Sequence, residues 1–235
     1  MKFAEPLQKV KLIRRYKRFL ADVEAESGEQ FTIHTANTGR MLGCAEPGSF
    51  VWISDSHNAK RKYRHSWELT ELDDGNLVGV NTGLANYLVK ELILSDIEPM
   101  LCGYECIRTE VPYGRERSRI DLLLEEGEGL PDCYVEVKNV TAKDGNFAIF
   151  PDAITARGTK HLRELADVVV QGYRGVIFFC VQRGDVTKFR PALEIDPLYA
   201  ETLREVVAKG VEVMAYRASI TNESVVLMTP MLIEY

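Results

Sequence analysis

The first third of the chain consists of short runs in which apolar and polar residues alternate. These runs lie at residues 10–26, 31–35, 50–54 and 67–72, and Gly, Pro, Asn and Asp residues separate them. Brief strands divided by turn-forming residues are typical of a small closed or partly open barrel. The most turn-rich stretch follows the last run, so we expect a first domain at residues 1–78 and a second at 79–235.

The strand expected around residues 12–20 does not separate into an apolar face and a polar face. Charged residues would fall on both sides of it, with Arg14, Tyr16 and Arg18 on one and Ile13, Arg15, Lys17 and Phe19 on the other. Burying these charges in a barrel would be unfavourable. The pattern therefore predicts either a β-bulge or a strand end that leaves the barrel.

Beyond residue 80 the apolar positions take the spacing of helices and of buried strands. Helices are expected after Asn81-Thr82, near residues 155–170, and from Asp196-Pro197 to Gly210. Between and after them, residues 175–182 are apolar throughout, as in a strand covered on both faces, and residues 211–216 predict another strand. Helices that alternate with apolar strands indicate a mixed α/β sheet, so the whole chain is of the α/β (α+β) class.

The charge is unevenly distributed along the 235 residues, whose formal net charge is −6. Residues 1–64 carry 12 Lys and Arg against 7 Asp and Glu, a balance of +5, whereas residues 65–235 carry 17 against 28, a balance of −11. Ten of the 12 Lys and Arg residues of this first part lie in two clusters, at residues 9–18 and 60–64. The total charge does not suggest a polyanionic partner, but the local distribution does.

Composition also excludes some classes of protein. No window of 18 residues is both apolar and uncharged, so we expect no transmembrane helix and no contact with a membrane. The first 20 residues lack the apolar centre of a signal peptide. The five cysteines are odd in number and scattered, which argues against a disulfide framework. A cytoplasmic globular protein is expected, and its oligomeric state stays open.

Two carboxylates and a lysine stand on strands that otherwise look buried. Fourteen residues separate Asp121 from Glu136, enough for a hairpin or a short crossover, and Glu136 and Lys138 share one face of their strand. Two carboxylates can bind Mg²⁺ or Mn²⁺ together with waters and phosphate oxygens, and the lysine could orient a water or stabilise negative charge. The alternative is a set of ion pairs that only neutralises itself.

The same three residues resemble the signature of the PD-(D/E)xK nucleases. Ile120-Asp121 matches its first half and Glu136-Val137-Lys138 its second, with isoleucine where the signature has proline. In that superfamily the proline position makes no metal contact and varies widely. The resemblance implies that Asp121 and Glu136 bind the metal and that Lys138 acts on the attacking water.

Nearly the whole sequence resembles the sugar fermentation stimulation protein A (SfsA) family. The resemblance rests on residues 12–24, 37–41, 47–54, 60–63, 118–124, 134–141, 150–165 and 178–191. It implies an N-terminal OB-like barrel, a C-terminal nuclease-like α/β domain, and DNA binding without sequence specificity. It also implies a role in regulating sugar catabolism.

Basic residues are expected to support such a site from two directions. On the helix at 155–170, Arg157, Lys160 and His161 share a face, and they could clamp phosphates or form an ordinary solvated surface. His161 could instead carry protons. Glu91 could supply a further acid, although a glutamate on a helix surface is the more ordinary interpretation.

The barrel supplies the remaining expected DNA contacts. Basic residues interleaved with Tyr16, Phe19 and Tyr63 suit a surface that follows a phosphate backbone and offers rings to bases. The candidates are Lys11, Arg14, Arg15, Lys17, Arg18, Lys60, Arg61, Lys62 and Arg64. Three functions stay open at this point: a metal-dependent deoxyribonuclease, a DNA-associated regulator without catalytic activity, and an enzyme acting on another phosphate ester.

Overall fold

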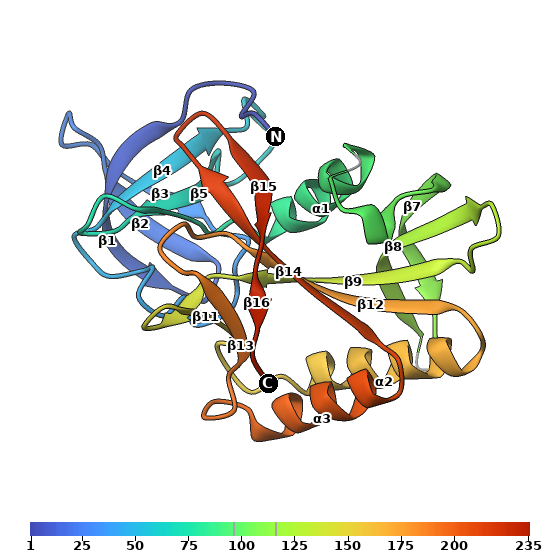
Figure 1. Cartoon of the computed structure of the whole chain (residues 1–235). Coiled ribbons are helices and arrows are strands. Elements are labelled where there is room, and N and C mark those ends of the chain that lie inside the picture. Colours follow the sequence, from blue (N-terminus) through green and yellow to red (C-terminus); the bar gives the residue numbers. More distant parts are fainter. Residues whose placement is uncertain (96, 116) are drawn as a thin grey trace.

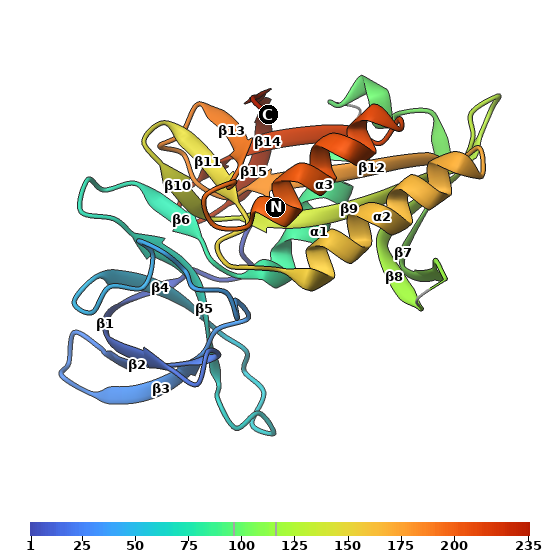
Figure 2. The same ribbon diagram turned by 90° about the horizontal axis from the view of Figure 1, so that it is seen from below.

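The computed structural model describes residues 1–95, 97–115 and 117–235, which form a barrel standing beside an α/β body (Figures 1 and 2). The strands of the barrel are β1 (Gln8–Tyr16), β2 (Leu20–Glu24), β3 (Gln30–His34), β4 (Phe50–Asp55), β5 (His65–Glu71) and β6 (Leu77–Gly79). They pair in the order β3-β2-β1-β4-β5-β6, and β3 also pairs with β5, which closes five strands into the expected OB-like barrel. Alternate residues such as Val10, Leu12 and Trp67 fill its core.

The irregular pattern of the first strand has a structural cause. The register between β1 and β2 shifts between Leu12 and Arg14, which is a β-bulge, one of the two predicted solutions. The strand then ends at Tyr16 in a tight turn where Lys17 and Arg18 both have positive φ. The bulge and the turn keep the charged side chains out of the barrel core.

A six-stranded mixed sheet forms the centre of the second domain. Its strands, in spatial order, are β15 (Val225–Pro230), β14 (Glu212–Ile220), β12 (Arg174–Val181), β9 (Cys133–Val140), β8 (Ser118–Gly127) and β7 (Tyr104–Tyr113). Strand β12 runs parallel to β9 and β14, while the other pairs are antiparallel. Residues 175–181 of β12 are all buried, as the apolar run predicts.

Helices cover both faces of this sheet (Figure 1). On one face lie η1 (Thr82–Leu84) and α1 (Ala85–Leu94), with η2 (Pro99–Leu101) beyond them; on the other lie α2 (Ala156–Val170) and α3 (Pro197–Ala208). The cap residues Asn81, Thr155 and Asp196 each accept a hydrogen bond from the first turn. None of the described helices is long and apolar enough to cross a membrane.

A smaller sheet completes the second domain, and the chain start and the end of β6 bond to that domain. The sheet contains β10 (Ala142–Asp144), β11 (Phe147–Phe150), β13 (Lys188–Pro191) and β16 (Leu232–Ile233). The terminal amine of Met1 contacts Glu91 of α1 and donates to the carbonyl of Val225 at 2.8 Å. Where β6 ends, Gly79 donates its N–H to the carbonyl of Gln182 at 2.8 Å. The two domains therefore share hydrogen bonds at several points.

Gly79 is expected to be indispensable to this junction. A Cβ added there would lie 2.3 Å from Oε1 of the fully buried Gln182. We predict that Gly79→Ala lowers the free energy of unfolding by about 1–3 kcal/mol, because a packed interior must shift to accept the methyl group. Urea denaturation would measure the loss. Gly184→Ala is the control, because an added Cβ there meets nothing within 4 Å; equal losses in the two variants would contradict the prediction.

Candidate metal centre and nucleic-acid interface

The candidate site lies where two neighbouring strands separate. Strands β8 and β9 pair from Leu122 to Leu124 against Val135 to Cys133, and the pairing stops at the next residues, Asp121 and Glu136. In the gap, Oδ2 of Asp121 accepts a hydrogen bond of 2.7 Å from the backbone N–H of Val137. The Asp121 carboxylate thus replaces the backbone carbonyl that would accept from Val137 in a continuous sheet. This hydrogen bond holds the carboxylate beside β9.

Glu136 is the most buried carboxylate of the site, with 2% of its surface exposed. Its Oε1 accepts a hydrogen bond of 2.5 Å from Nζ of Lys138 and also contacts Nδ1 of His161. Burial would raise the pKa of Glu136, but Lys138 and His161 outweigh it, and the pKa is lowered. Its other oxygen, Oε2, is buried and has no hydrogen-bond partner among the described residues.

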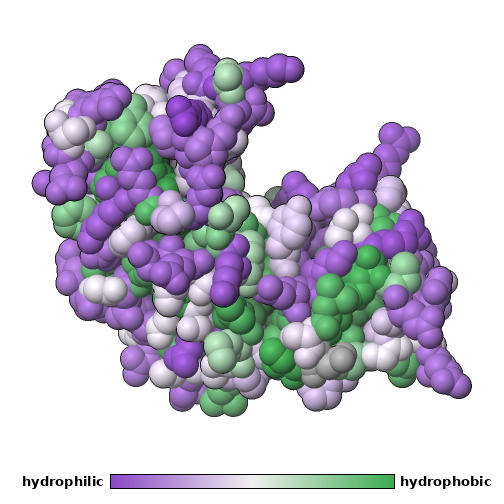
Figure 3. Space-filling view, turned by 90° about the horizontal axis from the view of Figure 1, so that it is seen from above, coloured by the Kyte–Doolittle hydropathy of each residue, from purple (hydrophilic) through white to green (hydrophobic). Residues whose placement is uncertain are grey.

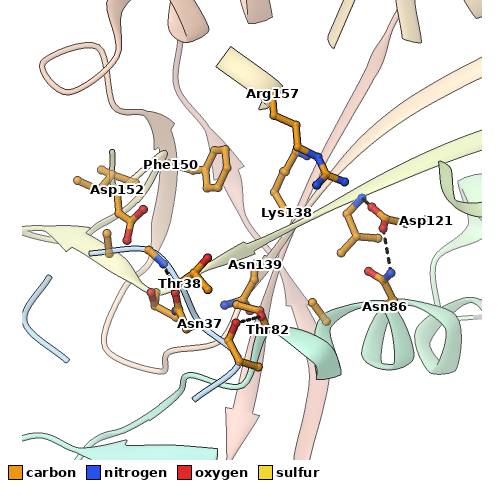
Figure 4. Close-up of a pocket in the computed structure, with 17 residues that line it drawn as sticks. Asn37, Thr38, Thr82, Asn86, Asp121, Lys138, Asn139, Phe150, Asp152 and Arg157 are labelled. Carbon is orange, nitrogen blue, oxygen red and sulfur yellow. Dashed lines mark hydrogen bonds between the residues drawn. The ribbon is translucent and has the colours of Figure 1, made fainter. Parts of the chain in front are cut away.

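Asp121 has neutral partners and the opposite pKa shift. Its Oδ1 accepts a hydrogen bond of 2.9 Å from the side chain of Asn86 on α1 (Figure 4). Burial and the nearby charge of Glu136 raise the pKa of Asp121 to about 6, and its hydrogen bonds offset this only in part. Near neutral pH the carboxylate therefore carries a charge that this structure stabilises poorly.

His161 is not placed as the sequence suggests. Its side chain is 4% exposed, so it cannot clamp a phosphate at the surface, and the expected DNA contact is corrected on that ground. Arg157 donates from Nε to Nε2 of His161 at 3.3 Å. Because Nε2 accepts this bond, we assign the ring proton to Nδ1, which donates to Glu136. The helical face from Arg157 to His161 thus packs against β9 and orients Glu136.

A divalent cation fits the donor set of this site. Two carboxylates approach each other, one of them has a buried oxygen without a partner, and the other has a pKa raised by burial and by its neighbour. The described residues contain no group of three or more His, Cys, Asp or Glu side chains that could hold a metal ion. Hard divalent cations can bind through only one or two protein carboxylates when waters complete their coordination, so two carboxylates are sufficient.

A cavity of about 440 Å³ opens beside the carboxylates, between the two domains (Figure 4). Asp121, Lys138 and Arg157 line it from the second domain, and residues 36–39 line it from the barrel. The molecular surface is hollowed between the barrel and the end of the body that carries β7 and β8 (Figure 3). The arrangement leaves the lysine and the arginine accessible to a phosphate group.

The basic residues of the barrel fall into two groups. Arg15 is half-buried: its Nη2 donates to the carbonyls of Asn37 at 2.8 Å and Gly39 at 3.0 Å, which gives it a structural role beside the predicted contact with DNA. Arg18 is exposed and donates to the carbonyl of Thr38 at 3.0 Å. The others are exposed: Lys11, Arg14, Lys17, Lys60, Arg61, Lys62 and Arg64.

Ion pairs reduce the free charge of some of these side chains. Arg14 pairs with Asp22 at 2.8 Å, and Arg64 pairs with Asp55 at 2.5 Å.

In the second domain, Lys160 is half-buried on α2 and Glu91 contacts the terminal amine, away from Asp121. Glu91 is therefore the ordinary surface glutamate and not a further acid of the site.

Periodicity and spacing assigned no role to four residues that line the cavity, although three of them lie in the stretches that resemble the SfsA family. Asn86 is the second residue of α1, where apolar spacing conceals it, Asn139 lies in β9, Phe150 ends β11, and Asp152 follows that strand. The local signal nearest to the cavity is the turn-forming sequence from Asn37 to Gly39 after β3. Their common role appears only when the barrel is packed against the second domain.

Asp121 gives a prediction about the stability of the metal-free protein. Since its pKa is about 6 in the folded state against an ordinary 3.8, its ionisation favours unfolding, and stability should fall as pH rises through this range. Asp121→Asn removes that charge, and the side-chain amide of Asn86 can rotate so that the hydrogen bond between residues 86 and 121 is kept. We expect a gain of about 1–2 kcal/mol in the free energy of unfolding near neutral pH, and none in acid.

Urea denaturation with a chelator present, at a series of pH values, would measure this gain. Asp73→Asn, in an exposed turn, is the matched control and should leave stability unchanged. A loss of stability in Asp121→Asn at neutral pH would show that the carboxylate is favourably placed without a cation, contrary to the interpretation given above.

Comparisons with known proteins agree with this fold. Residues 13–80 match the model of the SfsA N-terminal OB domain, and residues 83–224 match that of the sugar fermentation stimulation protein RE domain. A similar solved structure is Pyrococcus furiosus SfsA in complex with Ca²⁺, with a TM-score of 0.89 and 28% identity over 100% of this chain and 98% of that one. The barrel, the α/β domain and the matches along 13–80 and 83–224 together establish that the chain belongs to the SfsA family.

Proposed function

We propose that this protein binds DNA without sequence specificity and hydrolyses phosphodiester bonds with Mg²⁺ or Mn²⁺ held by Asp121 and Glu136. The proposal is supported by Asp121, Glu136 and Lys138 lying together where β8 and β9 separate, with Asp121 and Lys138 lining an open cavity and Glu136 buried beside Lys138. The relative from Pyrococcus furiosus is in complex with Ca²⁺, which supports a divalent ion in this family.

Each side chain of the site has a distinct task in this mechanism. The metal, when bound, would neutralise phosphate charge and lower the pKa of a water. Lys138, which is 12% exposed and reaches the cavity, can position that water and stabilise the charge that develops on the phosphate. Arg157 lines the same cavity and can hold a phosphate oxygen, while His161 keeps Glu136 in place.

A second function is favoured by one specific observation. Oε1 of Glu136 already contacts both Lys138 and His161, and both oxygens of Asp121 accept hydrogen bonds. Such a set of contacts also suits a site that no longer binds metal. The protein would then be a DNA-associated regulator of sugar catabolism without catalytic activity.

Cleavage assays separate the two functions. We expect wild-type protein to cut plasmid or single-stranded DNA when Mg²⁺ or Mn²⁺ is present, and Asp121→Ala and Lys138→Ala to lose about 100-fold or more in rate. Asp73→Ala and Lys209→Ala are the matched controls, because both residues are exposed and lie outside the cavity. Cutting that survives in the site variants would come from a contaminant, and no cutting by wild type would favour the regulator.

DNA binding has a test of its own. Arg61 and Lys62 are exposed on the barrel, and neither has an ion pair among the described residues. Replacing both with glutamine should weaken DNA binding and reduce the slope of log affinity against log salt by roughly 1–2. Fluorescence anisotropy at several salt concentrations would measure it, with Lys209→Gln as control. If the slope stays as in wild type, this face of the barrel does not contact phosphates.

A further inference from the structure

The cavity between the domains is larger and chemically more varied than a metal-dependent hydrolysis requires. Its volume of about 440 Å³ falls in the range of small-molecule sites. Asp121, Lys138 and Arg157 occupy one side (Figure 4). The other side contains amides, a hydroxyl and an aromatic ring, none of which has a task in the proposed chemistry.

The two sides of the cavity differ in charge. The cations Lys138 and Arg157 lie on the side of Asp121, while Asp152 lies opposite them, beside Thr38 (Figure 4). The carboxylate of Asp152 accepts a hydrogen bond of 3.2 Å from the N–H of Met41 of the barrel. Lys138 and Arg157 are the cations among the described residues that line the cavity, so they can attract a phosphate group to the first side, whereas on the second side the charge of Asp152 is partly offset by Arg15 of the barrel. The second side therefore suits the uncharged part of a ligand.

The barrel loop is held so that it faces this second side. Arg15 and Arg18 together bind the three successive carbonyls of residues 37–39. In addition, Thr82 donates to the carbonyl of Ala36 at 3.2 Å. Arginine and threonine donors thus fix the positions of the loop carbonyls. They also reduce the negative potential of these carbonyls at the wall of the cavity. The exposed side chain of Thr38 remains at the wall of the cavity.

Two residues give the second side the means to recognise a base. Gln182 donates to Oδ1 of Asn139, which fixes the orientation of that amide, with its Nδ2 donors pointing away from Gln182. The ring of Phe150 packs edge-to-face with Tyr199, at 5.3 Å between centroids, contacts Phe179 at 5.7 Å, and also lines the cavity. An amide donor and an aromatic ring are the groups that proteins use for the edge and the face of a base.

We propose that this cavity binds a single unpaired nucleotide, with its phosphate on the side of Lys138 and Arg157 and its nucleoside between Thr38, Asn139 and Phe150. The proposal rests on the proposed function and narrows its substrate. A base stacked and paired in a duplex cannot enter a cavity between two domains, so the reacting phosphate adjoins a flipped or single-stranded nucleotide. The barrel thereby forms part of the substrate site as well as a surface for DNA.

Titrations of small probes with the full-length protein test this directly. In Ca²⁺, calorimetry would compare thymidine 5′-monophosphate, 2-deoxyribose 5-phosphate and inorganic phosphate. We expect the nucleotide to bind about tenfold tighter or better than the other two, because stacking of one base accounts for that much. Equal binding of all three, or no binding of the nucleotide, would overturn the proposal.

A variant that fills the second side provides the matched test. Thr38→Trp should weaken nucleotide binding about tenfold or more and leave Ca²⁺ binding and thermal stability as in wild type, because Thr38 touches neither carboxylate of the metal site. Thr229→Trp is the control, since Thr229 is exposed on β15 outside the cavity. Nucleotide binding by Thr38→Trp equal to wild type would also overturn the proposal.

The outcomes separate this proposal from the proposed function. If the protein cuts duplex DNA with Mg²⁺ but binds the three probes alike, the nucleotide site is wrong and the hydrolysis stands. If the nucleotide binds selectively and Thr38→Trp abolishes it, but no DNA is cut, the site stands and the hydrolysis fails.

Discussion

The buried carboxylate of Glu136 is the constraint on which the rest of this site depends. An ion with 2% exposure in the central sheet costs several kcal/mol unless other groups compensate for the lost water. Lys138, two residues further along the same strand, and His161, from a helix on that face, supply the compensation. Helix α2 must therefore pack closely on β9, and its cap at Thr155 and its course across the sheet set the position of His161.

The two carboxylates of the site show how partners decide the state of a charge. Glu136 meets a cation and a histidine proton, which outweigh its burial and lower its pKa; Asp121 accepts from two neutral N–H donors, and burial and the charge of Glu136 raise its pKa to about 6. The charge of Glu136 is thus offset by the protein, although its Oε2 has no partner among the described residues, while the charge of Asp121 is offset only in part. A divalent ion beside Asp121 would remove that imbalance, so the asymmetry is itself an argument for a cation at this place.

The sequence predicted what depends on local periodicity and missed what depends on packing between distant segments. The barrel, the mixed sheet, the capped helices and the bulge near Arg14 all followed from strand and helix patterns. The sequence did not reveal the internal contacts of His161 and Arg15, because a pattern shows which residues share a face but not what lies against that face. Strand β9 covers His161, and Arg15 donates to loop carbonyls about two dozen residues further along the chain.

The position of the barrel has a consequence for how the two domains can act. A barrel that only gripped DNA could be joined to the second domain by a flexible linker. Here hydrogen bonds join it to the second domain, through Gly79 and Gln182 on one side and through Met41 and Asp152 on the other. The loop at residues 37–39 and Lys138 consequently line the same cavity. The proposal of a ligand bound by both domains at once rests on that placement together with the polar chemistry of the cavity.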